Sequence, residues 1–142
     1  MDAKIKAVAE ACAEGIANDT MTFPQISLML AEAGVERMLS DPCRGTTIYY
    51  TADGESLELS APGRKQAVAY AFDAVAIKAV IEEGRNALAE GGGLVPGYSY
   101  KSFFPKLAAA GCAGSMISFP GRYTVYFGRT GEAHVEPFPP LK

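Results

Sequence analysis

The sequence contains an internal repeat, and this repeat limits the possible folds more than any other feature. Four blocks recur in the same order, and the spacing between them changes by only a few residues. The matched blocks are 5–8 with 77–80, 23–34 with 100–111, 38–44 with 116–122, and 47–55 with 124–132. One such match can arise by chance, but four in series indicate a duplication. The two repeat units cover about residues 5–60 and 77–137.

Each unit predicts two helices followed by three short strands. Apolar residues of the first block recur at helical spacing, from Ile5 to Ile16 and from Ile77 to Leu88. A shorter helix follows, with Thr22 as its expected N-cap, and it ends at Gly34, or at Gly111 in the second unit. The expected strands are 35–40, 46–51 and 56–60, then 113–118, 122–127 and 132–136. The fold class is therefore α+β: a tandem duplication of a helix–helix–three-stranded antiparallel meander unit with a pseudo-twofold axis.

A chain of 142 residues has the size of one domain. Because neither unit could build a large core alone, residues 1–142 are expected to form a single domain with the helices packed on one face of the sheet. Strand alternation then separates two sets of side chains. The set assigned to the core is Ile48, Tyr50, Tyr123, Val125 and Phe127. The set assigned to a half-polar face is Thr47, Tyr49, Thr51, Thr124 and Tyr126.

Hairpin chemistry predicts the pairing of the last two strands of each unit. A three-residue loop, 129–131, would place Tyr126 opposite His134 and Thr124 opposite Glu136. In the first unit a two-residue loop, Asp53-Gly54, would place Tyr50 opposite Leu57. The predicted hairpin of the second unit puts His134, Glu136 and Tyr126 on one face, where a histidine, a carboxylate and a phenol could perform general acid–base chemistry.

Composition and motifs argue against several classes of function. The net charge is −3, and the 13 basic residues are scattered among 16 acidic ones, which is unlike a nucleic-acid binder. Cys12, Cys43 and Cys112 form no metal-binding pair, and one histidine is too few for a zinc site. The glycine-rich stretch 91–97 lacks the pattern of a phosphate loop. We therefore predict no metal, no cofactor and, without a signal peptide or a long apolar segment, a cytoplasmic protein that does not enter membranes.

Part of the sequence resembles a known family. The run 106–111, followed by 124–128, Gly131-Glu132 and 134–137, resembles the YdfO/YbcV-like domain of bacteria and their prophages, sometimes labelled phage envelope protein. The resemblance covers most of the chain and is clearest after Tyr98, whereas the stretch 91–97 departs from it. It implies a mixed α/β fold and no established activity, and nothing in this sequence supports the envelope label.

The repeat also ranks the candidate functional residues. Residues shared by both units, such as Arg44 with Arg122 and Tyr49 with Tyr126, are explained most simply by the fold, and otherwise by a pseudo-symmetric cleft. His134 occurs in one unit only. The favoured function is a non-enzymatic module that binds a small molecule or a protein, at the face carrying Tyr49, Tyr126 and His134 or in the crease between the units. The alternative is a small hydrolase or isomerase that uses His134 with Glu136 or Glu132.

The sequence also predicts a homodimer. The first strand of each unit carries few charges, and 113–118 carries none. Because unpaired strands at a sheet edge invite pairing, a second copy is expected to dock at an edge or at an apolar face.

Overall fold

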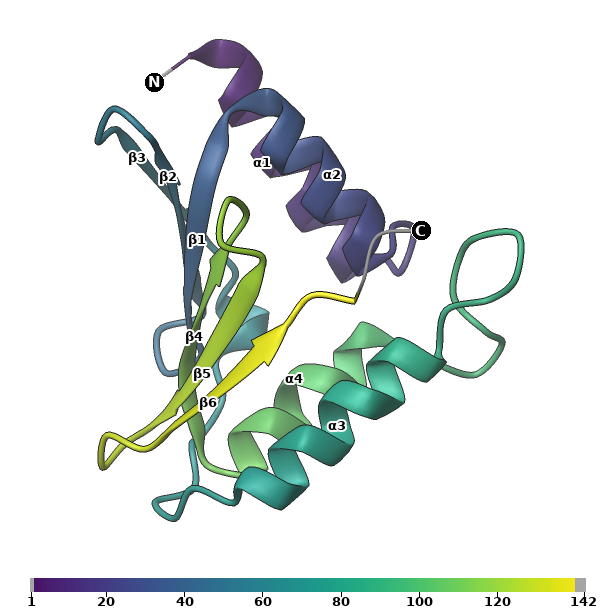
Figure 1. Ribbon diagram of the computed structural model, residues 1–142, viewed down its shortest axis with the longest axis vertical. Coiled ribbons are helices and arrows are strands. Elements are labelled where there is room, and N and C mark those ends of the chain that lie inside the picture. The colour runs from purple at the N-terminus through teal and green to yellow at the C-terminus, as the bar shows by residue number, and fades with distance from the viewer. Residues whose placement is uncertain (1, 140–142) are drawn as a thin grey trace.

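The computed structural model describes residues 2–139 and has an α+β fold with four α-helices and a six-stranded antiparallel sheet. Figure 1 shows the sheet on one side of the molecule and the helices on the other, in two pairs that diverge from each other. The first half contains α1 (Ala3–Ala17), α2 (Phe23–Ala33), β1 (Val35–Asp41), β2 (Thr46–Thr51) and β3 (Ser56–Ser60). A 3₁₀ turn, η1 (Pro62–Arg64), leads to α3 (Ala74–Asn86), α4 (Tyr100–Ala109), β4 (Cys112–Ser118), β5 (Tyr123–Gly128) and β6 (Ala133–Pro137).

The strand order is β3-β2-β1-β4-β5-β6, so the first strands of the two halves pair with each other at the centre. Both halves share one register. Met38 pairs with Tyr49 and Ser115 with Tyr126, and an irregularity falls between 35 and 37 in β1 and between 112 and 114 in β4. An offset of 77 residues relates these positions, and it also relates Gly34 (φ 103°) to Gly111 (φ 93°).

The helices begin where the sequence provides caps. The Thr22 hydroxyl accepts the N–H of Gln25, and the Gln25 side chain accepts the N–H of Thr22. Asp73 and Ser99 cap the starts of α3 and α4 with their side-chain oxygens. These contacts satisfy N–H groups that the first turn of a helix leaves without partners. No helix within residues 2–139 has the length and apolarity that a membrane span requires.

The starts of α2 and α4 are bonded across the two halves. Asp19, in the turn after α1, accepts the hydroxyl of Ser99 at 2.7 Å and the N–H of Tyr100 at 2.9 Å. The Tyr100 hydroxyl in turn accepts the N–H of Phe23 at 2.8 Å. Each helix start thus supplies a partner for the other, and this joint fixes the spacing of the two helix pairs at one end.

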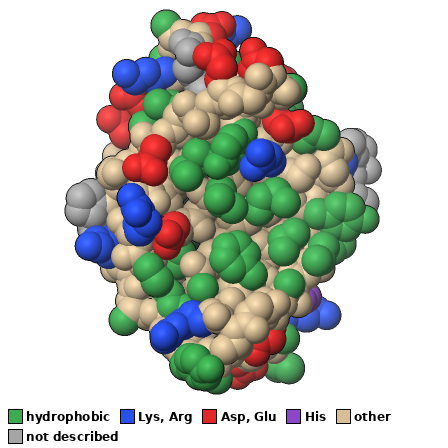
Figure 2. Space-filling model, turned by 90° about the vertical axis from the view of Figure 1, so that its left-hand side faces the viewer, with side chains coloured by type: hydrophobic (Ala, Val, Ile, Leu, Met, Phe, Trp, Pro, Cys, Tyr) green, Lys and Arg blue, Asp and Glu red, His purple; other side chains and the backbone are tan. Residues whose placement is uncertain are grey.

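The assignment of the two sheet faces was wrong. Tyr49, Tyr126 and Thr124 are buried beneath the helices, whereas Tyr123 and Val135 are 49% and 54% exposed. The other face carries the alternate set Leu39, Ile48, Tyr50, Met116, Val125 and Phe127, each partly buried. Figure 2 looks onto that face and shows apolar side chains gathered across it. Because apolar residues occupy both alternating sets, strand periodicity alone did not decide which set the helices cover.

The prediction for the second hairpin is confirmed, and the one for the first is wrong. Tyr126 pairs with His134 and Thr124 with Glu136, but Tyr49, not Tyr50, pairs with Leu57. The Thr51 N–H donates to the carbonyl of Glu55, which leaves a three-residue loop. Gly54 and Gly131 both have φ near 91°, so the two hairpins use the same glycine turn and the same register.

Two further predictions depend on this register. Arg122 has φ 60° and occupies the position of Gly45, which has φ 69°, so the structure does not equate it with Arg44. In both turns this residue donates its N–H to the carbonyl four positions earlier.

The low-charge strands β1 and β4 pair with each other, and the edges are β3 and β6. Pairing through the first strands is thus excluded, while a homodimer through another surface stays a prediction.

Candidate functional site

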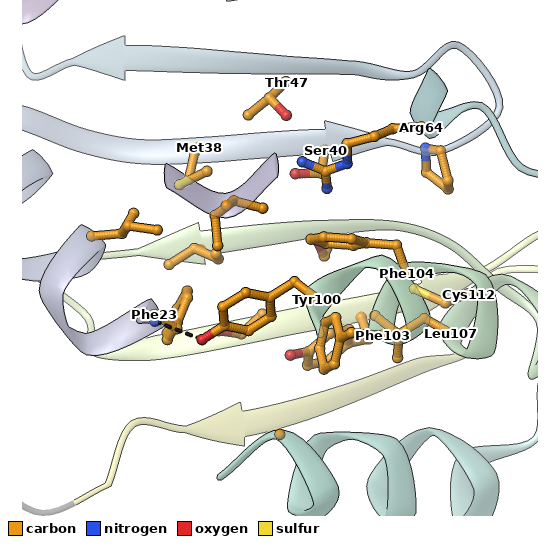
Figure 3. A pocket seen from close by; sticks show the side chains of 18 of the residues that line it. Phe23, Met38, Ser40, Thr47, Arg64, Tyr100, Phe103, Phe104, Leu107 and Cys112 are labelled. Atoms are coloured by element: carbon orange, nitrogen blue, oxygen red, sulfur yellow. Dashed lines mark hydrogen bonds between the residues drawn. The ribbon is translucent and has the colours of Figure 1, made fainter. Parts of the chain in front are cut away.

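A pocket lies between the two helix pairs, above the centre of the sheet. One apolar cluster joins α1 and α2 to β1 and β2 through Cys12, Leu30 and Tyr49, and a second joins α3 and α4 to β4 and β5 through Ile77, Leu107 and Tyr126. The pocket of about 280 Å³ opens between these two cores and is lined by residues of all four helices and of all six strands. Figure 3 shows aromatic and aliphatic side chains converging on it from both halves.

Two serines occupy the floor of the pocket. Ser40 of β1 and Ser115 of β4 are direct partners in the central strand pair, and both line the pocket. The next inward-facing pair is Met38 with Ile117, whose side chains are much larger. Since the small pair and the large pair are adjacent on the same strands, the sheet has room for another molecule at the serines. The pocket therefore originates in side-chain size at the central strand pair of the sheet.

The predicted ligand residues Tyr49 and Tyr126 both line the pocket. Burial is the main cause that raises the pKa of Tyr49, to about 12; nearby Cys12 raises it further, and Arg64 lowers it. Burial likewise raises the pKa of Tyr126, with Cys112 and Glu136 adding to the effect. Both phenols are therefore neutral hydrogen-bonding groups at neutral pH. Burial also raises the pKa of the Cys12 and Cys112 thiols, so neither is an activated nucleophile.

The buried phenol of Tyr49 predicts a loss of stability in alkali. Its pKa is raised in the folded state, so its contribution is fully present below pH 10, the value for a free tyrosine, and is lost as the pH rises toward 12. We expect the wild type to lose up to roughly 2 kcal/mol more than Tyr49→Phe over that range. Urea unfolding at stepped pH measures the difference. Tyr70→Phe, at a 65% exposed side chain, is the control and should follow the wild type.

His134 and Glu136 are close together but at the edge of the pocket. His134 Nε2 lies 2.8 Å from Glu136 Oε1, and the His134 ring is 6.5 Å from that of Tyr126. Glu136 also accepts a bond from Arg85 Nη1 at 2.8 Å, and Arg85 donates to the carbonyl of Pro137. Glu136 and Tyr126 line the pocket, but His134 does not. The carboxylate is thus already paired with an arginine, and the imidazole is not part of the pocket lining.

The other predicted residues lie elsewhere. Arg44 is exposed in the β1–β2 turn, and Arg122 lies 5.3 Å from the ring of Phe138. Neither lines the pocket. Glu132 bonds to the hydroxyl of Thr130 within its hairpin, which lowers the pKa of that carboxyl, and Cys43 is exposed. The structure therefore separates these residues from Tyr49 and Tyr126.

Sequence reasoning missed the charged and aromatic residues that complete the pocket. Arg64, Arg85, Tyr100 and Phe104 all line it. Arg64 lies outside both repeat units, in the connection between them, while Tyr100 was visible only as the repeat partner of Phe23. Within residues 2–139 no group of three or more acidic, histidine or cysteine side chains is arranged to hold a metal ion.

A scan against protein-family models and a search among curated proteins gave no match for this chain. The resemblance to the YdfO/YbcV-like domain therefore stays a prediction.

Proposed function

We propose that this protein is a non-enzymatic module that binds a small, largely apolar molecule in the pocket between its two helix pairs. The observation that carries the proposal is the pocket of about 280 Å³ beside the serine pair, lined mainly by aliphatic and aromatic residues. An apolar cavity of roughly 150 Å³ is enough to bind benzene. The hydroxyls of Ser40, Ser115 and Tyr49 would orient the ligand, as a few polar groups do in most apolar sites.

The fold favours this location because the pocket lies where two similar halves meet. We propose that the halves arose by duplication, which is supported by their shared strand register and by left-handed glycines at equivalent positions, such as Gly34 with Gly111. Burying the apolar helix faces of two such units leaves a crease between them. The prediction of a cytoplasmic location is kept as part of this proposal.

Filling the pocket tests the proposal. Phenylbutanol, a neutral ligand with an apolar body, is titrated into the wild type and into Ser115→Phe by calorimetry. The new ring would occupy the space next to Ser40, so we expect affinity to fall by at least ~10-fold, or about 1.4 kcal/mol. Thermal unfolding should change by only a few degrees, since the added ring enters existing space.

The matched control is Ser56→Phe, at an exposed position of β3 outside the pocket. This variant should bind phenylbutanol as the wild type does. A large loss of stability in Ser115→Phe, of the 1–3 kcal/mol typical of an overpacked core, would show that the pocket is not open space. Failure of the wild type to bind either phenylbutanol or another small, largely apolar molecule of its size would count directly against the proposed function.

A further inference from the structure

Arg64 is fixed at the pocket by the segment between β3 and α3. The N–H of Ala61 donates to the carbonyl of Gly45 at 2.7 Å, that of Arg64 to Ala61 at 2.8 Å, and that of Gln66 to Pro42 at 2.8 Å. Gly45 has φ 69°, and a Cβ there would lie 2.7 Å from the Ala61 carbonyl oxygen, so the close approach requires glycine. The backbone of η1 is thereby held against the β1–β2 turn.

The Arg64 side chain lies within the pocket without a carboxylate partner. Its guanidinium carbon is 3.6 Å from the centre of the Phe104 ring, and no acidic side chain of residues 2–139 forms an ion pair with it. Figure 3 shows the guanidinium pointing into the pocket on the side of Ser40 and Thr47. Burial is also the main influence on its pKa, which it lowers, so the charged form is poorly solvated in this position.

The other charged residues of the pocket do not neutralise the positive charge of Arg64. Four charged side chains occur in the lining: Asp41, Arg64, Arg85 and Glu136. Arg85 and Glu136 neutralise each other at 2.8 Å. Asp41 belongs to the strand positions that face away from the helices, and its carboxylate accepts the N–H groups of Cys43 and Arg44. An apolar pocket with one uncompensated arginine is electrostatically suited to a molecule with one negative charge.

We propose that the ligand of this pocket is an apolar monocarboxylic acid whose carboxylate is bound by Arg64. The inference rests on the proposed function and specifies its ligand class. The guanidinium donates two parallel hydrogen bonds to the carboxylate oxygens, and the hydrocarbon body lies among the aromatic side chains of α4 and α2. Ser40 and Thr47 supply hydroxyl donors on the same side of the pocket. A neutral molecule of the same shape leaves the guanidinium without an anion and binds more weakly.

The test compares phenylbutyrate with phenylbutanol, which share an apolar body and differ in the charged end. In the wild type we expect the acid to bind at least ~10-fold more tightly by calorimetry. In Arg64→Met the acid should lose roughly 10- to 100-fold in affinity, the range for a hydrogen bond to a charged group, while the alcohol stays within about threefold. Arg64→Lys keeps the charge but not the fork of donors, and should fall between them.

Arg44→Met is the control variant, because Arg44 is exposed and does not line the pocket. Both ligands should bind it as they bind the wild type. Equal affinities of the acid and the alcohol for the wild type would overturn this inference and leave the proposed function intact. An equal weakening of both ligands in Arg64→Met would also overturn it, whereas binding of neither ligand to the wild type would overturn the proposed function itself. If Arg64→Met does not fold, the wild-type comparison and Arg64→Lys still decide the matter.

Discussion

Gly111→Ala is expected to cost about 4 kcal/mol or more of unfolding free energy, an unusually large effect for the addition of one methyl group. Gly111 has φ 93°, a conformation that costs an L-residue roughly 1–2 kcal/mol. A Cβ there would also lie only 2.1 Å from the carbonyl oxygen of Ala71. That segment cannot move aside freely, because Ala69 and Asp73 donate their N–H groups to the end of α4, to Ala108 and Ala110. Urea unfolding measures the loss.

Gly34→Ala separates the two causes. Gly34 is related to Gly111 by the same offset and has φ 103°, but a Cβ there would meet only Ile5 Cδ1, at 3.8 Å. Its expected cost is therefore the backbone strain alone, about 1–2 kcal/mol. Equal losses in the two variants would show that the segment before α3 is not packed against the end of α4.

Local signals in the sequence located most of the secondary structure. Strands β2 and β3 coincide with their predicted ranges, whereas β4 begins one residue earlier than predicted and β5 and β6 are each shifted by one residue. The reason is that turns depend on residues that are recognisable one at a time, such as Gly34, Gly111 and the two hairpin glycines. The first hairpin shows the limit, since Asp53-Gly54 fits a loop of two residues as well as the observed loop of three.

The identity of the covered face depends on long-range packing. Tyr49 and Tyr126 lie beneath the helices, whereas Val125 and Phe127, which are as apolar, lie on the opposite face. A tyrosine is large enough to contact the helices and carries a hydroxyl that the pocket can accommodate. Strand alternation alone contains no information on which side the helices pack, so Tyr49 and Tyr126 were correctly grouped but placed on the wrong face.

The pocket could be predicted only in part. The pairing of Tyr126 with His134 and of Thr124 with Glu136 followed from the second hairpin, and the crease between the units was a predicted location for a ligand. Arg64 could not be found in this way, because its place depends on backbone bonds to Gly45 and Pro42, residues about twenty positions away. Arg85 could not be found from the sequence either. Its partner Glu136 lies 51 residues further along the chain, in β6, and no spacing rule connects the two residues.

The hydrogen bonds that join the starts of α2 and α4 predict the second large loss of stability. Tyr100 is 5% exposed, its ring packs edge-on against those of Tyr98 and Phe103, and its hydroxyl accepts the N–H of Phe23. We expect Tyr100→Ala to cost roughly 3–5 kcal/mol, as removal of a buried aromatic ring usually does. Tyr100→Phe keeps the ring and should cost about 1 kcal/mol, the value of one hydrogen bond. Urea unfolding of both variants separates ring from hydroxyl.

The neighbouring tyrosine provides the control for the hydroxyl. Tyr98 has a buried hydroxyl without a hydrogen-bond partner among residues 2–139, and burial is the main cause that raises its pKa to about 12. Because an unsatisfied buried hydroxyl costs free energy, Tyr98→Phe should be neutral or stabilising, while Tyr100→Phe destabilises. A phenolic oxygen is thus removed from each of two rings in contact, and the expected changes in stability have opposite signs. If both variants lose stability equally, the bond from Phe23 to Tyr100 does not hold the two helix starts together.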